Sequence, residues 1–409
     1  MKYKIIGFTA IFLLTFLFYL QGYHYINTAW NSIRQNLAAV FLHESITITD
    51  LKSRYDGAGQ GKTKVRVLIV PGHEPAYGGA EYKDLNEGDM NVELAGYLEK
   101  FLKNDSHYDV MLSRGVNGWD RALSAFFNES SEKISRFINE NHDNMLHLVN
   151  NGSVVKVMDG IKHSKAPKDV ALRLYGINMW ADENKIDVLI HVHFNDYPRK
   201  NAGMLGKYSG FAIYVPERQY SNATTTRALA DAVYKRLAKY NPTSDLPKEK
   251  AGVIEEQDLI AIGSNNTLEA PSMLIEYGYI YESQFADSKV RKLVLKDLAF
   301  QTYLGMGDFF GDRGTAYAYD TLLLPYVWDS TFTRIKSDKN DVLALQTALM
   351  AEGLYPVSPK NKNDCPRTGT FGECTSSALE EFQRKYGIKS EKNMVGKETA
   401  KVLNRLYSL

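Results

Sequence analysis

The stretch that decides the fold is "VLIVPGHEP", Val67 to Pro75, an apolar run that stops at Pro71 and Gly72 and is followed by His73. A short uninterrupted apolar run is typical of a strand buried on both faces, as in a parallel sheet covered by helices. A histidine of the core would lie inside such a run. We therefore expect the strand to deliver His73 to a site at its end.

Strand-like and helix-like segments alternate from Lys64 onwards. This alternation indicates an α/β domain at residues 64–312, with a mostly parallel sheet flanked by helices. Residues 115–167 interrupt this alternation of strands and helices and are predicted to be a largely helical insertion. The insertion is either a cover over the site or a purely structural hairpin. Strands are predicted at 64–70, 108–114, 185–196, 210–216 and 271–280, and helices at 88–103, 170–184, 224–240 and 288–310.

Side chains that could bind a metal occur where these elements begin or end. His73 and His193 end two predicted strands, and Glu276 follows an apolar run in a third. Glu87 lies in the first turn of the helix after His73, where the helix dipole alone would also favour a carboxylate. Because ligands gather beyond the carboxyl ends of parallel strands, we expect these groups to converge. Two imidazoles and one carboxylate suit a catalytic zinc ion, and the second carboxylate suits a general base.

His191 and His193 point to the same face of their strand because side chains alternate along it. His193 is nearer the strand end and is the predicted ligand. His191 is expected behind it or in the core.

Five motifs together resemble the zinc-dependent N-acetylmuramoyl-L-alanine amidases of the amidase 3 type. The resemblance implies that His73, Glu87 and His193 bind Zn²⁺ and that Glu276 is catalytic. It also implies hydrolysis of the amide between N-acetylmuramic acid and the L-alanine of the peptidoglycan stem peptide. The motifs are "VPGHEP" (70–75), "LNEGDMNVELAGYLEKFL" (85–102), "VMLSR" (110–114), "IHVHFND" (190–196) and "PSMLIEYGY" (271–279).

Three further residues of these motifs, Arg114, His191 and Asn195, are expected to support the ligands or to contact the substrate. In some relatives a helical insertion occludes the active site until a partner removes it. The resemblance therefore makes a regulatory protein acting on residues 115–167 a candidate partner. Two other functions stay open, a zinc peptidase that cuts within the stem peptide and a non-catalytic protein that binds or anchors to peptidoglycan.

The C-terminal part, residues 339–409, is predicted to be a small three-helix domain after a connector at 313–338. It repeats an apolar-Gln pair in "LQTALMAEG" (345–353) and "FQRKYG" (382–387), and it resembles the peptidoglycan-binding domain often attached to cell-wall hydrolases. Cys365 and Cys374 are the only cysteines, and in an exported protein we expect them to form a disulfide.

The composition of the N-terminal segment predicts that the protein is exported. Lys2 and Lys4 precede an uncharged apolar segment, Ile5 to Leu20, and no small-x-small cleavage site follows. We expect residues 1–25 to be an uncleaved transmembrane anchor, with a cleaved secretory signal as the alternative, and residues 26–63 to be a stalk and linker. Either way the catalytic domain lies outside the cytoplasm, and under the first reading in a single-pass protein of the cell membrane. The net charge of +1 gives no reason to expect a nucleic-acid partner.

Overall fold

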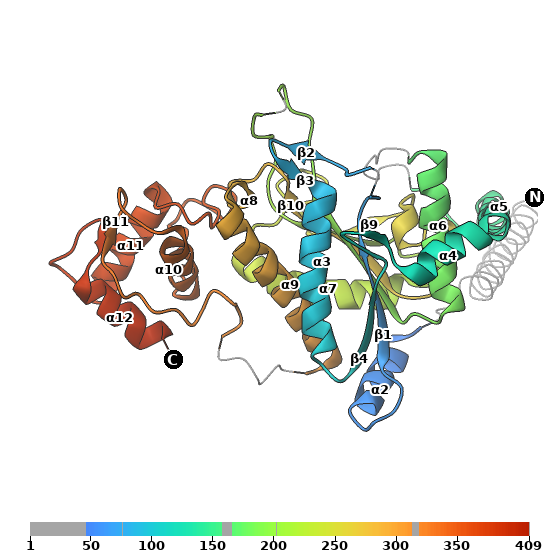
Figure 1. Cartoon of the computed structure of the whole chain (residues 1–409), viewed down its shortest axis with the longest axis horizontal. Coiled ribbons are helices and arrows are strands. Elements are labelled where there is room, and N and C mark those ends of the chain that lie inside the picture. The colour runs from blue at the N-terminus through green and yellow to red at the C-terminus, as the bar shows by residue number, and fades with distance from the viewer. Residues whose placement is uncertain (1–45, 76, 158–165, 202, 313–318, 409) are drawn as a thin grey trace, which may run out of the picture.

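The computed structural model describes residues 46–75, 77–157, 166–201, 203–312 and 319–408 (Figure 1). Its centre is a six-stranded sheet in the order β4-β1-β7-β10-β8-β9. Neighbours from β4 to β10 are parallel, β8 is antiparallel to β10, and β9 is parallel to β8. The predicted α/β fold with a mostly parallel sheet is therefore confirmed. The strands are β1 (Val65–Pro71), β4 (Tyr108–Leu112), β7 (Val188–Asn195), β8 (Ala212–Pro216), β9 (Val253–Glu256) and β10 (Ser272–Tyr279).

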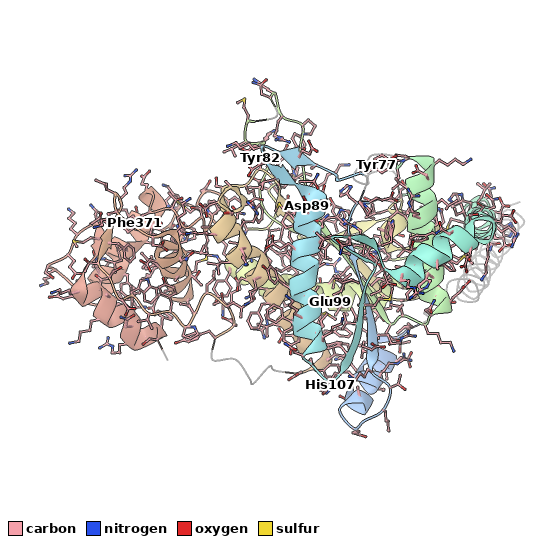
Figure 2. The ribbon with its side chains drawn as sticks, in the orientation of Figure 1. Tyr77, Tyr82, Asp89, Glu99, His107 and Phe371 are labelled. Carbon is pink, nitrogen blue, oxygen red and sulfur yellow. A yellow bond between two sulfur atoms is a disulfide. The ribbon has the colours of Figure 1, made fainter. Side chains whose placement is uncertain are left out.

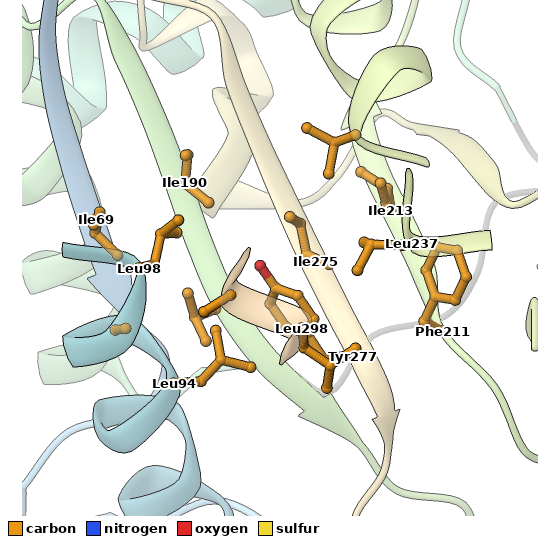
Figure 3. Close-up of a cluster of buried hydrophobic side chains, with 14 of the residues drawn as sticks. Ile69, Leu94, Leu98, Ile190, Phe211, Ile213, Leu237, Ile275, Tyr277 and Leu298 are labelled. Carbon is orange, nitrogen blue, oxygen red and sulfur yellow. The ribbon is translucent and has the colours of Figure 1, made fainter. Parts of the chain in front are cut away.

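Helices cover both faces of the sheet, which explains why its strands are apolar on both sides. Alternate residues of β1 enter two different cores, with Val67 and Ile69 in one and Leu68 and Val70 in the other. The first core is completed by α3 (Glu87–Lys103), α7 (Ala223–Tyr240) and α9 (Ser288–Phe310) (Figure 3). The second core is completed by α4 (Arg121–Glu129), α5 (Ser131–Asn150) and α6 (Lys168–Glu183).

Short elements connect this framework. The two-stranded hairpin β2 (Glu81–Tyr82) and β3 (Leu85–Asn86) precedes α3, and a second hairpin, β5 (Arg114–Gly115) and β6 (Gly118–Trp119), opens the insertion. Two 3₁₀ turns, η1 (Ile260–Ile262) and η2 (Ser264–Asn266), precede β10, and α8 (Ser283–Ala286) follows it. Within the insertion, residues 158–165 lie outside the described residues.

The N-terminal anchor expected at residues 1–25 and the stalk up to residue 45 lie outside the described residues. In the part of the chain that is described, no helix has both the length and the apolar character needed to cross a bilayer. The first described helix, α2 (Ile48–Ala58), packs Leu51 and Tyr55 into the first core. The composition of Asp56 to Ala58 predicts a linker, but these residues form the last turn of α2. Tertiary packing here overrides a weak local preference.

The C-terminal domain has the three predicted helices, α10 (Lys339–Ala351), α11 (Glu373–Lys385) and α12 (Lys397–Tyr407), and a separate apolar core. The domain also contains a small sheet of β11 (Phe332–Thr333) and β12 (Met394–Val395), which was not predicted. The predicted disulfide between Cys365 and Cys374 is present, with an S–S distance of 2.03 Å.

The C-terminal domain docks on the α/β domain beside α8 and α9, at the opposite end of the molecule from α4 and α5 (Figure 1). Buried Arg367 forms an ion pair with Asp297 of α9 at 3.4 Å. Asn363 Nδ2 donates to Thr243 O at 3.0 Å and to Ser209 O at 3.2 Å. The loop from α10 to α11, which the disulfide ties to α11, therefore makes much of this contact.

Candidate metal centre

His73 lies two residues after the end of β1, at the end of the sheet where β1, β7 and β10 finish; we call this end the site rim. Its backbone has a φ of 63°, in the left-handed region that residues other than glycine seldom adopt. A strained backbone conformation is kept only where the surrounding structure imposes it, and such residues cluster at functional sites. Here Gly72 N donates to Val192 O at 2.8 Å and holds the turn against β7. The turn thereby directs the imidazole towards the start of α3.

Glu87 is the first residue of α3 and is buried. Its Oε2 lies 2.8 Å from His73 Nε2, and its Oε1 lies 3.2 Å from His193 Nδ1. Backbone N–H groups of Ala80 and Phe194 donate to the same two oxygens. Burial would raise the pKa of Glu87, but hydrogen bonds and charge from His193 and His73 hold that pKa well below its ordinary range. The carboxylate is therefore ionised and faces both imidazoles.

His193 completes the cluster from β7, and its ring centroid lies 5.2 Å from that of His73. One ligand atom from each of His73, Glu87 and His193 lies within 4.8 Å of the others. Burial lowers the pKa of His193, although the neighbouring Glu87 opposes that shift. A neutral imidazole is the form that binds a metal. Within the ranges that the structure describes, no other such group of His, Cys, Asp and Glu converges.

Glu276 approaches the cluster from the neighbouring strand, because it is the register partner of His193 in the β10–β7 pair. Register partners on adjacent strands point to the same face of a sheet. Glu276 Oε2 is buried and, among the described residues, has no hydrogen-bond partner. Burial first, and then the charges of Glu87 and Glu249, raise the pKa of Glu276 well above its ordinary value. A carboxyl group that readily takes up a proton therefore stands beside the three potential ligands.

Two glycines keep the centre of the cluster open. A Cβ on Gly72 would lie 2.2 Å from the ring of His193. A Cβ on Gly79 would lie 2.5 Å from both Glu87 Oε2 and His73 Nε2, and Gly79 also has a φ of 80°. Both positions therefore require a residue without a side chain.

Arg114 and Asn91 brace the turn that carries His73. Arg114 is buried, and its guanidinium donates to Pro71 O at 3.2 Å and to Gly72 O at 2.5 Å. Asn91 Nδ2 donates to Gly72 O at 3.2 Å and lies 3.5 Å from Glu87 Oε1. The structure thus places Arg114 behind the ligands, in contact with the backbone.

His191 and Asn195 lie on the same face as His193, as alternation predicts. His191 is buried, and burial followed by the charge of His193 lowers its pKa to about 3. Asn195 Nδ2 donates to Glu249 Oε1 at 3.1 Å. Neither contacts His73 or Glu87 through any hydrogen bond found among the described residues.

Sequence reasoning missed three residues that the structure brings to this region. Asn91 had a usable signal, because a polar residue one turn after Glu87 interrupts the apolar face of the helix. Glu74 forms a two-point ion pair with Arg173 of α6, at 2.5 and 2.6 Å, and so links the His73 turn to the helices of the second core. Glu249 lies in a polar turn, where no pattern in the sequence predicts its burial.

Figure 2 shows the position of the site rim on the molecule: Tyr77, Tyr82 and Asp89 gather at the end of α3 where the helix begins, and Glu99 and His107 lie at the opposite end. The three ligand candidates meet at the same end as Asp89.

The sequence matches two families. Residues 67–299, more than half of the chain, match the family described as N-acetylmuramoyl-L-alanine amidase. Residues 338–403 match the family described as putative peptidoglycan binding domain. A search of curated proteins found no match.

Several solved structures are similar to the chain. One is an N-acetylmuramoyl-L-alanine amidase from Clostridium difficile 630, with 18% sequence identity, a TM-score of 0.38, and 62% of this chain and 100% of that chain covered. Another is the CwlD amidase from Clostridioides difficile in complex with the GerS lipoprotein, with 14% identity, a TM-score of 0.38, and 61% and 99% covered. A third is the amidase Ami1 from Mycobacterium smegmatis, with 14% identity, a TM-score of 0.38, and 61% and 99% covered.

Proposed function

Because the chain belongs to the N-acetylmuramoyl-L-alanine amidase family, we propose that His73, Glu87 and His193 hold the Zn²⁺ ion with which it cleaves peptidoglycan. The bond cleaved joins the lactyl group of N-acetylmuramic acid to the L-alanine of the stem peptide. The family match favours this amidase reaction over the peptidase and the non-catalytic alternatives. The observation that carries the metal assignment is the convergence of the three ligand atoms within 4.8 Å.

The residues present fit a zinc ion. Two imidazoles and one carboxylate form a usual ligand set of catalytic zinc sites, which keep a further position open. Gly72 and Gly79 leave the space between these groups free of side-chain atoms. Arg114 and Asn91 fix the surrounding backbone, as supporting residues do around metal ligands.

A bound zinc ion supplies Lewis acidity, which activates water and polarises the scissile carbonyl group. The protein supplies the proton transfers. We assign these to Glu276, whose carboxylate takes a proton from the water as the water oxygen attacks the lactyl carbonyl carbon. The same carboxyl group then gives a proton to the nitrogen of L-alanine as the carbon–nitrogen bond breaks. The raised pKa of Glu276 favours taking up the proton from the water.

The remaining parts of the chain support a function in the cell wall. The C-terminal domain belongs to a peptidoglycan-binding family, and attaching such a domain raises the local concentration of the catalytic centre on its substrate. We propose that residues 1–25 anchor the chain in the cell membrane and leave the catalytic domain outside the cytoplasm. The basic start and the apolar segment Ile5–Leu20 support this proposal. A regulatory protein acting on residues 115–167 remains a proposal by analogy with relatives.

The experiment that tests this function is the substitution Glu276→Gln, which keeps the size of the side chain and removes its proton transfer. We expect the release of stem peptides from purified sacculi to fall by about 100-fold or more, on the usual scale of general acid–base catalysis. The variant should still bind one equivalent of zinc, measured by mass spectrometry of the metal. Glu129→Gln, an exposed carboxylate in α4, is the matched control and should retain wild-type activity.

Mass spectrometry of the products identifies the bond. Amidase action leaves stem peptides with a free L-alanine amino terminus and glycan strands without peptide. New amino termini further along the stem would instead identify a peptidase. Wild-type activity in Glu276→Gln would refute the role of Glu276.

A further inference from the structure

A second carboxylate is buried next to the candidate metal centre. Glu249 lies in the turn between α7 and β9 and is only 1% exposed. Burying a carboxylate is unfavourable unless hydrogen bonds compensate for the lost water. Glu249 accepts hydrogen bonds from four neutral side chains, namely Tyr214, Asn195, Ser244 and Tyr279.

These donors join the ends of the two strands that carry the proposed site. Asn195 ends β7, two residues after His193, and donates to Glu249 Oε1 at 3.1 Å. Tyr279 ends β10, three residues after Glu276, and its hydroxyl donates to Glu249 Oε2 at 3.2 Å. One carboxylate therefore spans both strand ends.

The β10–β7 pair needs such a connection, because its register shifts between Glu276 and Tyr279. A bulge of this kind loosens the ladder locally and re-aims the side chains beside it. Gly278, inside the shift, has a φ of 150°, and regular pairing resumes where Ile280 N donates to Asn195 O at 2.9 Å. Glu249 binds the side chains of Asn195 and Tyr279, which lie at the position where this pairing begins again.

A third strand is tied to the same carboxylate. Tyr214 of β8 is the register partner of Leu274 and shares the face of Glu276, since Leu274 and Glu276 are two residues apart on β10. Its hydroxyl donates to Glu249 Oε1 at 2.5 Å. The carboxylate thus connects β7, β8 and β10 around Glu276.

We propose that Glu249 is a positioning residue of the amidase, which fixes Glu276 relative to His193 by clamping the bulged ends of β10 and β7. The proposal rests on the proposed roles of His193 and Glu276. Glu249 acts through Asn195, Tyr279 and Tyr214 and has no contact with the substrate. Removing the carboxylate leaves four buried donors without their acceptor and lowers stability as well, so the test must read the geometry of the site separately from stability.

The test compares Glu249→Ala with Glu249→Gln. Displacing a catalytic group by about 1 Å can cost about 100-fold in rate, so Glu249→Ala should lower kcat by that order while KM stays nearly constant. Glu249→Gln keeps an acceptor for Asn195 and Tyr214, and its amide can donate to the hydroxyls of Ser244 and Tyr279. It should therefore recover most of the lost kcat.

Hydrogen exchange gives a readout that needs no turnover. In Glu249→Ala the amides of residues 277–282 should exchange faster than in the wild type, and zinc content should be unchanged. This measurement separates the clamp from the catalytic assignment, because it holds even if Glu276→Gln proves active.

Asp297→Asn is the matched control, since Asp297 is another buried, hydrogen-bonded carboxylate but belongs to α9. It should lower thermal stability and leave kcat on a soluble muramyl peptide unchanged. If Glu249→Ala does not fold, Tyr279→Phe removes a single donor and should still lower kcat. Wild-type kcat in Glu249→Ala and in Tyr279→Phe, or unchanged exchange at residues 277–282 in Glu249→Ala, would overturn the proposal.

Discussion

At the scale of single residues, the proposed zinc site depends on positions where a side chain is absent as much as on the ligands. Gly72 is the clearest case, because any Cβ there would meet the ring of His193 at 2.2 Å. The Gly72 backbone also accepts hydrogen bonds from Arg114 and Asn91, so it cannot move away easily. The ring of His193 must give way instead.

Gly72→Ala should therefore weaken zinc binding by about 10-fold or more, the usual cost of disturbing the support of a metal ligand. Competition with a chelator measures the affinity. Gly96→Ala is the matched control, since a Cβ at this position of α3 meets nothing within 4 Å. The control should keep wild-type affinity and gain up to about 1 kcal/mol in stability. Equal zinc affinity in both variants would contradict the proposed ligand geometry.

Local patterns in the sequence indicate the candidate ligands but not the residues that hold them. His73, His193 and Glu276 were predictable because each ends or interrupts an apolar run. Glu249 was not, because "LPKEKAG" (246–252) reads as a solvated turn. Its burial results from three strands that meet it only in the folded chain.

At the scale of elements, the insertion supplies part of the second core. Ile134 of α5 and Leu123 of α4 are fully buried and pack with Leu68 and Val70 of β1. Gly176 of α6 allows this approach, because a Cβ there would lie 3.0 Å from Ile134 and 3.1 Å from Phe127. The helices α4 and α5 thus act as a structural cover of the sheet.

Ile134→Ala should destabilise the protein by about 2–5 kcal/mol, as expected for a fully buried aliphatic side chain. Urea unfolding measures the change. Activity at a temperature where the variant is folded should equal that of the wild type. Val116→Ala, in the same insertion but 87% exposed, should stay within about 0.5 kcal/mol. Unchanged stability together with raised activity would instead indicate a removable lid.

Most elements of the catalytic domain follow from apolar periodicity, and the predicted helix at 288–310 coincides with α9. The strand β9 (Val253–Glu256) was missed, because a four-residue edge strand with two glutamates lacks a clear apolar period. The helix α2 lies where a stalk and linker were expected, and Tyr55 of this helix stacks on both Phe310 and His107.

At the scale of the whole molecule, the C-terminal domain docks close to the site rim. Asn363 contacts Ser209, which lies three residues before Ala212, the register partner of Glu276. Arg367 is buried between Asp297 and the ring of Tyr240, 5.1 Å from the ring centroid. The peptidoglycan-binding family domain therefore packs next to the start of β8, the strand that pairs with the strand carrying Glu276.

Arg367→Ala should separate the two domains, because removing one partner of a buried ion pair costs about 3–5 kcal/mol. Calorimetry should then show two unfolding transitions. Cleavage of a soluble muramyl peptide should persist, and digestion of sacculi should slow. Lys389→Ala, at an exposed position of the same domain, is the control. A single transition at the wild-type temperature in Arg367→Ala would contradict the coupling.

The metal centre itself is tested most directly by anomalous diffraction at the zinc absorption edge, from crystals grown with Zn²⁺. We predict one strong peak in the catalytic domain, bound by His73, Glu87 and His193, with the carboxyl group of Glu276 facing it. An anomalous peak bound by other residues would contradict the proposed zinc site. So would the absence of any peak in crystals in which Glu87 stays hydrogen-bonded to both histidines.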